Sequence, residues 1–166
     1  MLATERLRLR AFEPGDVDAI ASLLGDATAM RYVGDGEPHD RSAAEDKMRE
    51  SRASLEANGT GALAVVLSAT DEVIGYCGIE IGEDTGELEL NYALSPSVWG
   101  NGFAFEAARA VVDYADTFLE VLLATADPRN SASVRILGRL GFEHTHTAYD
   151  IHGLPTAFFR RTRPET

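Results

Sequence analysis

The stretch that decides the fold joins a strand to a helix through a loop that contains glycine: Leu94-Ser95-Pro96-Ser97-Val98-Trp99-Gly100-Asn101-Gly102-Phe103-Ala104-Phe105-Glu106-Ala107. An apolar strand ends at Leu94, and a helix is expected to begin at about Gly102. The first turn of a helix leaves backbone N–H groups unpaired and carries a partial positive charge. Gly100 and Gly102 let the backbone approach a ligand closely. The segment therefore predicts an anion site made of main-chain groups, without lysine or arginine.

Two common phosphate-binding motifs do not fit this segment. A Walker-type loop would end in Gly-Lys-Ser/Thr, and no such ending is present. The dinucleotide-binding fingerprint requires a different spacing of the glycines. Because many helices follow glycine loops for structural reasons alone, the assignment depends on the rest of the chain.

The region before the loop is rich in strands. Residues 62–67, 73–81 and 87–94 are apolar or β-branched runs. Turn-forming residues separate them at 68–72 and 82–86. This pattern predicts an antiparallel meander with short hairpin loops.

Helical signals flank the meander. Pro14 can open a helix that runs to about Leu24, and Ser42 and Glu45 have the spacing of a capping box that starts a helix to about Ala57. Residues 32–40 hold two glycines and a proline and are expected to form a loop. The remaining elements are a first strand at 7–11, helices at about 102–118 and 130–140, and strands at 121–126, 142–149 and 156–161.

The resulting element order is β-α-α-β-β-β-α-β-α-β-β. It predicts an α/β (α+β) domain over residues 1–166, with one mixed sheet. Length and an apolar content of 45% allow a sizeable core.

The formal charge of −12 makes nucleic acid an unfavourable partner, because the protein field repels phosphate. The same field attracts amines, although acidity also serves solubility. Cys77 is the single cysteine, which excludes an intramolecular disulfide. No apolar stretch of about 18 residues is present, so we expect no membrane partner and a cytoplasmic location.

Two blocks of sequence resemble one known family. Trp99-Gly100-x-Gly102-Phe103-Ala104-x-Glu106-Ala107 is similar to the acyl-CoA pyrophosphate loop of RimJ/RimL-type enzymes of the GNAT superfamily of N-acetyltransferases. The second block matches the Asn-x-x-Ser-x-x-x-Leu segment of these enzymes and their Leu-Gly-Phe ending, at Asn130, Ser133, Leu137 and 140–142. The opening run 4–10 is a softer match. The resemblance implies a GNAT-like, mostly antiparallel seven-stranded sheet flanked by about four helices, with acetyl-CoA as co-substrate and no metal.

The resemblance also implies which residues bind acetyl-CoA: Ala93, Leu94, Trp99, Gly100, Asn101, Gly102, Phe103, Ala104, Asn130 and Ser133. Pantetheine amides would pair with the strand at Ala93 and Leu94. The family often has a charged or amide side chain at Ser97 and a lysine at Asn101. Both positions are neutral here, so the phosphates would rest mainly on backbone N–H groups and the helix dipole.

Candidate catalytic residues lie on the strand before the loop and on the later helix. Glu87, Glu89 and Asn91 share one strand face, and Leu88, Leu90 and Tyr92 share the other. By resemblance, Glu89 lies beside the acceptor amine and acts as general base; the alternative is a solvated carboxylate. Ser133 would assist the leaving thiol, or be an ordinary helix-surface serine. Asn130 is also a plausible helix N-cap. Tyr32 and Asn91 are expected to bind the acceptor.

Cys77 lies in an apolar strand and is expected to be a core residue. His144, His146 and His152 could form a zinc site only with ligands that the sequence lacks, and could instead line the substrate cleft. Trp99 could anchor the core or wall the CoA loop, and we expect the anchor.

The leading hypothesis is transfer of an acetyl group from acetyl-CoA to a primary amine, by direct attack in a ternary complex. RimJ/RimL-type relatives act on protein N-termini, so the expected acceptor is the α-amine of a protein or peptide. One alternative is a small amine such as a polyamine, an amino acid or an aminoglycoside, which a sizeable acidic cleft lined from the 32–40 loop would favour. A second alternative is a CoA-binding sensor without catalysis. A homodimer is possible.

Overall fold

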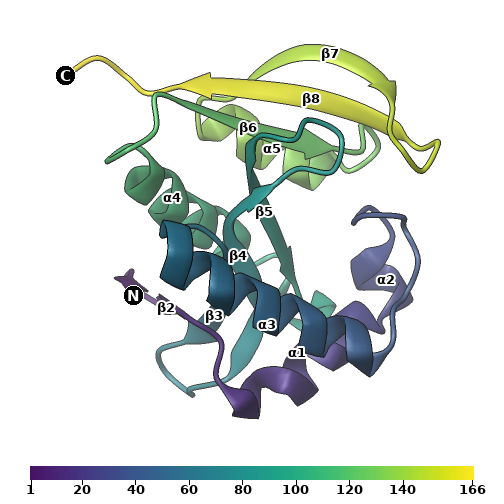
Figure 1. Cartoon of the computed structure of the whole chain (residues 1–166), viewed down its shortest axis with the longest axis vertical. Coiled ribbons are helices and arrows are strands. Elements are labelled where there is room, and N and C mark those ends of the chain that lie inside the picture. The colour runs from purple at the N-terminus through teal and green to yellow at the C-terminus, as the bar shows by residue number, and fades with distance from the viewer.

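The computed structural model describes all residues, 1–166, and contains one eight-stranded sheet in the order β1-β2-β3-β4-β5-β6-β8-β7 (Figure 1). Every neighbouring pair is antiparallel except β5 and β6, which are parallel. The strands are β1 Leu2–Ala3, β2 Leu7–Arg10, β3 Ala62–Leu67, β4 Val73–Ile81, β5 Leu88–Leu94, β6 Val121–Ala126, β7 Glu143–Tyr149 and β8 Pro155–Thr162.

Five α-helices accompany the sheet: α1 Val17–Leu24, α2 Ala27–Met30, α3 Arg41–Asn58, α4 Phe103–Ala115 and α5 Ser131–Arg139. Short 3₁₀ turns precede α1 at Pro14–Asp16 and α4 at Pro96–Val98. The predicted mixed, mostly antiparallel sheet is confirmed, with β1 and α2 as the elements that the sequence did not reveal. None of the helices is both long and apolar enough to cross a lipid bilayer.

The predicted start of α3 is wrong by two residues. Asp40 is the N-cap, and its carboxylate accepts a hydrogen bond from the backbone N–H of Ala43. Ser42 donates its hydroxyl to the same carboxylate at 2.7 Å, so it supports the cap and does not form it. A charged acceptor is a stronger partner for the helix start than a hydroxyl.

The far end of α4 also differs from the prediction. The helix ends at Ala115, and Phe118 lies in the following turn, 45% exposed, with its ring against Tyr114. The helical spacing of Phe118 therefore reflects a turn that continues the helix direction.

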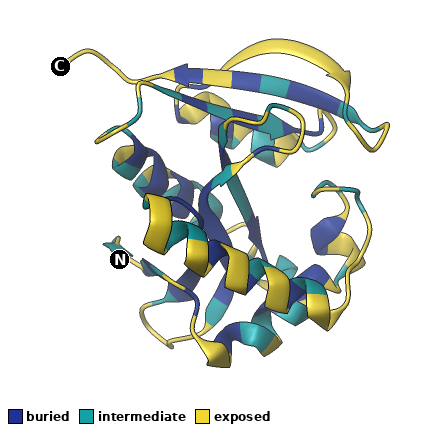
Figure 2. Ribbon diagram, viewed as in Figure 1, coloured by how far each residue is buried: buried dark blue, intermediate teal, exposed yellow.

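The two faces of the sheet carry separate cores. Val65 packs with the side chains of α4 and α5, whereas its neighbours Ala64 and Val66 pack with α1–α3. Figure 2 shows the central strands buried between helices, while β7 is exposed along its length at the sheet edge. Because successive side chains of a strand point to opposite faces, burial on both faces explains why β3 is apolar throughout.

Strands β5 and β6 meet at one point only. Their register contains a single residue pair, Glu89 with Leu123. By contrast, β6 pairs with β8 along its whole length, from Val121 to Ala126. The sheet is therefore two half-sheets, β1–β5 and β6–β8–β7, which part beyond Glu89.

The backbone of Gly78 in β4 lies close against the backbone of Gly61 and Ala62 at the start of β3. A Cβ atom at this position would lie 2.1 Å from the carbonyl oxygen of Gly61. We predict that Gly78→Ala lowers the free energy of unfolding by about 3 kcal/mol, the upper end for overpacking. The measurement is urea unfolding followed by circular dichroism.

Gly138→Ala is the matched control, because Gly138 lies within α5 with open space around it. It should raise the free energy of unfolding by about 0.5–1 kcal/mol through helix propensity. Equal stability of the Gly78 variant and wild type would contradict the tight approach.

Candidate active site

The loop between β5 and α4 presents unpaired backbone donors. Gly100 and Gly102 have φ angles of 79° and 80°, in the left-handed region that favours glycine. Gly102 is the N-cap of α4, and no side chain caps the helix. The N–H groups at Phe103 and Ala104 therefore have no intrahelical acceptor. The amide of Asn101 donates to the carbonyl oxygens of Val98 and Trp99 and holds the loop closed.

Trp99 lies outside the core. Its side chain is 52% exposed, and its indole N–H donates to the carbonyl oxygen of Leu94 at 2.9 Å. The expectation that Trp99 anchors the core is wrong, because the indole N–H finds its acceptor at the end of β5, beside the loop. Trp99 instead stands at the base of the glycine loop.

The backbone of β5 has a free edge where β6 departs. Ser95 N–H donates to the carbonyl oxygen of Ile74, which makes these residues a hydrogen-bonded pair. Since such pairs alternate in antiparallel sheets, Ala93 is directed toward Tyr76 in β4, and the peptide groups of Tyr92 and Leu94 are directed toward β6. The predicted main-chain contact through Ala93 is therefore wrong, because the peptide groups of Ala93 are directed into the sheet. The edge groups nearest the loop belong to Tyr92 and Leu94, with the carbonyl of Leu94 already bound by the indole.

A cleft of about 490 Å³ runs through the gap between the half-sheets. Glu89 and Asn91 line it from the sheet face that carries α1–α3, and Tyr92 lines it from the face that carries α4 and α5. Of the predicted site residues, the cleft brings together Tyr32, Glu89, Asn91, Asn130 and Ser133. The predicted loop residues Trp99, Gly100, Asn101, Gly102, Phe103 and Ala104 gather instead at the exit of β5.

Glu89 is a buried carboxylate. It is 9% exposed and accepts a hydrogen bond from the hydroxyl of Thr85 at 2.8 Å. Gly82 makes room for it, because a Cβ there would lie 2.2 Å from Glu89 Cδ. Burial raises the pKa of Glu89 above its ordinary value, and the nearby Asp84 adds to the shift, against the opposing hydrogen bond from Thr85. A carboxylate whose pKa is raised toward neutrality is suited to accept a proton.

Glu80 lies directly across from Glu89 in the β4–β5 register, and sequence reasoning missed it. Lys47 Nζ is 3.1 Å and 3.2 Å from its two carboxylate oxygens, and the Asn91 amide donates to it at 2.7 Å. Burial acts to lower the pKa of Lys47, but Tyr76 and Glu80 outweigh it, and the pKa is raised. Lys47 therefore stays cationic, and the amide of Asn91 is engaged in holding Glu80.

A hydroxyl pair lies on the other side of the gap. Tyr92 Oη and Ser133 Oγ are 2.7 Å apart. Burial raises the pKa of Tyr92 to about 12, although the hydrogen bond with Ser133 acts to lower it, so this phenol keeps its proton at neutral pH. Asn130 caps α5 by accepting from the backbone N–H of Ser133 at 3.2 Å, which confirms its expected N-cap role. The only sequence signal for Tyr92 was its apolar-face register.

The cleft is strongly acidic. Its lining contains two permanent cations, Arg31 and Lys47, and seven carboxylates: Glu50, Glu80, Glu83, Asp84, Glu89, Asp127 and Asp150. The predicted loop at 32–40 contributes Tyr32, Val33, Gly34 and His39 to the lining.

The histidines near the cleft differ in their positions. His152 lines the cleft and is 3.0 Å from a carboxylate oxygen of Glu83, which raises its pKa. His144 and His146 do not line it: His144 bonds Thr147, and His146 stacks on Phe158. The expectation that His144 and His146 line the cleft is therefore wrong, because both lie on the exposed edge strand β7. The structure contains no group of three or more acidic, histidine or cysteine side chains arranged to hold a metal.

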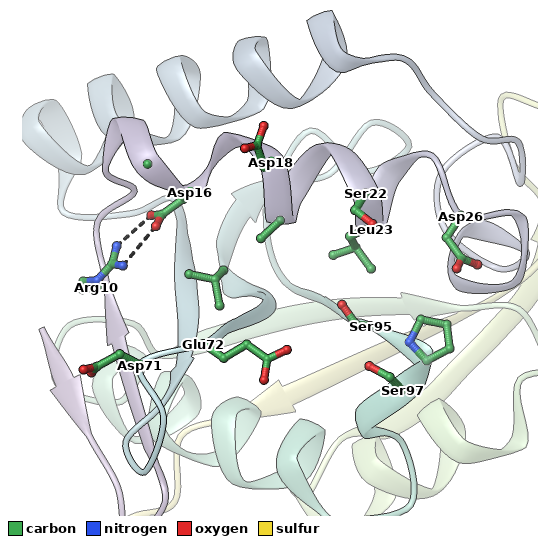
Figure 3. A pocket seen from close by; sticks show the side chains of 14 residues that line it. Arg10, Asp16, Asp18, Ser22, Leu23, Asp26, Asp71, Glu72, Ser95 and Ser97 are labelled. Carbon is green, nitrogen blue, oxygen red and sulfur yellow. Dashed lines mark hydrogen bonds and ion pairs between the residues drawn. The ribbon is translucent and has the colours of Figure 1, made fainter.

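A second hollow, of about 670 Å³, lies between α1 and the turn at Ser95–Ser97 (Figure 3). Ser22 lines it from α1 and Glu72 lines it from the opposite side, whereas the carboxylate of Asp18 points away from the hollow and pairs with Arg41. Of its charged side chains, five are carboxylates and one is Arg10, which is already paired with Asp16. A hollow of this charge would repel phosphate, so it does not compete with the glycine loop for an anion.

A helix start with free donors, a parted strand pair and a buried carboxylate at the gap define an acyl-CoA-dependent N-acetyltransferase. The chain belongs to the GNAT family, since the family model described as an acetyltransferase (GNAT) domain matches residues 6–143.

Known proteins agree with this assignment. An uncharacterised N-acetyltransferase, p20, of Bacillus licheniformis is 34% identical over 146 residues, covering 86% of this chain and 82% of the relative. A crystal structure of an acetyltransferase from Agrobacterium tumefaciens is 30% identical with a TM-score of 0.81, covering 96% and 92% of the two chains. A spermidine N-acetyltransferase from Vibrio cholerae, solved with CoA and spermine, shares the fold at 20% identity and a TM-score of 0.77, covering 96% and 97%.

The glycine loop gives a direct test of anion binding. Gly102→Val adds a β-branched side chain at a positive φ, a strain of about 1–2 kcal/mol, and crowds the helix start. We predict that acetyl-CoA affinity falls at least about tenfold, as measured by isothermal titration calorimetry.

Gly86→Val is the control, because Gly86 also has a positive φ, in the turn before β5, with open space around it. It should lower stability and leave acetyl-CoA affinity unchanged. Wild-type affinity in the Gly102 variant would sink the loop assignment.

Proposed function

We propose that this enzyme transfers an acetyl group from acetyl-CoA to a primary amine of a small polycationic acceptor, by direct attack in a ternary complex. The observation that carries the proposal is the acidic cleft that runs through the gap between β5 and β6. A cleft reached from both sheet faces lets a thioester and an amine meet at the gap from opposite sides.

On the acetyl-CoA side, the residues present fit the expected ligand. The free N–H groups at the start of α4 suit the pyrophosphate. The edge groups at Tyr92 and Leu94 suit the pantetheine amides, which would add to β5 as a strand. Asn130 and Ser133 lie where the thioester end would reach. Because Ser97 and Asn101 are neutral, main-chain donors supply most of the phosphate contacts.

The chemistry follows from the two sides of the gap. The amine nitrogen bonds to the thioester carbon, the carbon–sulfur bond breaks, and CoA leaves as a thiolate. Glu89 accepts the proton from the amine, directly or through a water. The Ser133 hydroxyl donates a hydrogen bond to the departing sulfur, and Tyr92 holds that hydroxyl in place. The reacting group enters as an ammonium, so it loses two protons: the one that Glu89 removes before attack passes on to solvent, and the one that the nitrogen loses after attack ends on the thiol, whose unperturbed pKa is about 8.5.

Charge favours a polycation as the acceptor. With seven carboxylates against Arg31 and Lys47, the cleft attracts a molecule that carries several ammonium groups. Glu80 is held by Lys47 and Asn91, so the carboxylates nearest the gap are ordered.

A protein N-terminal α-amine is the second candidate. Its pKa of about 7.7–8.0 leaves it partly neutral, so it needs less help from a base than a lysine-like amine with a pKa of about 10.4. The RimJ/RimL-like motifs also favour it.

The first experiment measures thiol release from acetyl-CoA with two acceptor pools, linear polyamines and short peptides with free N-termini. We predict turnover with polyamines, and a KM that rises with salt because screening weakens attraction to the acidic cleft. Turnover with peptides alone would move the function to N-terminal acetylation. Tight acetyl-CoA binding without turnover on either pool would favour a sensor.

A second experiment tests the base. We predict that Glu89→Gln lowers kcat about 10²–10⁴-fold with little change in acetyl-CoA affinity. Since the pKa of Glu89 is raised and its carboxylate form accepts the proton, wild-type activity should fall as pH drops through that raised pKa.

The matched control is Glu87→Gln, because Glu87 is exposed and lies just before β5. It should retain the wild-type rate and pH profile. An unchanged rate in the Glu89 variant across pH 6–9 would remove Glu89 from the mechanism.

A further inference from the structure

Two segments that are far apart in the sequence, residues 4–6 and residues 101–106, meet at the start of α4. The carboxylate of Glu106, in the first turn of the helix, accepts hydrogen bonds from Thr4 Oγ1 at 2.6 Å and from the backbone N–H of Arg6 at 2.9 Å. The Arg6 guanidinium contacts the same carboxylate, with Nε and Nη2 each 2.7 Å from Glu106 Oε2. Arg6 Nη1 donates to the carbonyl oxygen of Asn101 at 2.9 Å, within the glycine loop. The N-terminal motif at 4–6 is thereby joined to the proposed pyrophosphate site.

Arg6 also lies against the loop through its flat face. The guanidinium carbon is 4.4 Å from the centre of the Phe103 ring. Its Nη2 is the only atom within 4 Å of the position that a Cβ on Gly102 would take, at 3.5 Å. One side chain therefore contacts the loop, the first helical residue and the acidic residue of the first turn.

The charge of Glu106 presents a difficulty for anion binding. Burial acts to raise the pKa of Glu106, but hydrogen bonds from Thr4 and Arg6 outweigh it, and the pKa is lowered. Glu106 is thus ionised at neutral pH, one turn from where the pyrophosphate would bind. An isolated carboxylate there would repel the phosphate and offset the positive potential that the helix start offers to an anion.

We infer that Arg6 is a positioning residue for the acetyl-CoA pyrophosphate: it neutralises Glu106 and fixes the glycine loop with the helix start open to the anion. The inference rests on the proposed function, because it takes that loop as the CoA site. An exposed ion pair contributes little to stability. This pair differs because Glu106 is only 18% exposed and receives three hydrogen bonds and one further ion-pair contact from two residues.

The test compares two acetyl donors. Acetyl-CoA carries the pyrophosphate, and S-acetylpantetheine carries the same thioester arm without it. Dissociation constants are measured by calorimetry for acetyl-CoA and by ligand-observed NMR for S-acetylpantetheine, with no acceptor present. The variants are Arg6→Gln, Glu106→Gln and the double variant.

The matched control is Arg8→Gln. Arg8 lies two residues further along and pairs with Asp71 at the surface, away from α4. Thermal unfolding of each variant checks that it folds. If Arg6→Gln does not fold, Arg6→Lys replaces it, because lysine keeps the positive charge but lacks the several nitrogen donors of the guanidinium.

We expect Arg6→Gln to weaken acetyl-CoA binding about tenfold and S-acetylpantetheine binding less than about twofold. The double variant should bind acetyl-CoA more tightly than Arg6→Gln alone, because the unpaired carboxylate is gone. Arg8→Gln should match wild type.

Wild-type affinity in Arg6→Gln, or equal weakening for both donors, would overturn the role of Arg6 while leaving the acetyl-CoA site in place. Failure of wild type to bind acetyl-CoA would instead overturn the proposed function, and the inference with it.

Discussion

Between Glu89 and Leu123 the two central strands make their single pairing, and beyond it β5 and β6 part. A parted pair leaves backbone donors and acceptors without partners, which is costly in a protein interior unless water or a ligand meets them. Helices pack on both faces of the sheet, and α4 and α5 share one core with strands of both half-sheets. The same gap exposes the β5 edge and opens the cleft, and Glu89 lies at the point where the two strands begin to separate.

Glycine residues shape the site at both ends of β5. At the exit of the strand, Gly100 and Gly102 bend the backbone so that the N–H groups of α4 remain free. Near its start, Gly82 leaves the space that the Glu89 carboxylate fills. The anion site and the buried carboxylate therefore both depend on positions where a side chain is absent, and β5 fixes the separation between them.

Much of the fold was predictable because its signals are local. Hydrophobic periodicity and turn residues located the meander and the long helices, and Asn130 carried its capping signal in the sequence. The features that the sequence did not predict are short or depend on which of two polar residues caps a helix. The helix α2 has only four residues, held by Asp26, whose carboxylate accepts from the N–H groups of Thr28 and Ala29. At Asp40 a stronger acceptor displaced the predicted serine cap.

Part of the candidate site was likewise predictable from the sequence, and part was not. Glu89 and Ser133 could be proposed from motifs, and the structure places both in the cleft. The partners that define their surroundings come from distant elements: Lys47 from α3, Tyr92 from the other face of β5, and Arg6 from the N-terminal segment. Sequence spacing cannot reveal such partners, because strand order and helix packing decide them.

The paired carboxylates Glu80 and Glu89 show why those distant partners matter for chemistry. They face each other across β4 and β5, so identity and position alone would give them equivalent roles. Lys47 and the Asn91 amide bind Glu80 and fix it as a compensated charge. Glu89 has only the neutral Thr85 hydroxyl and the nearby Asp84, and burial raises its pKa. Environments that differ in this way assign separate roles to like groups, with Glu89 able to move a proton and Glu80 held as the ionised partner of Lys47.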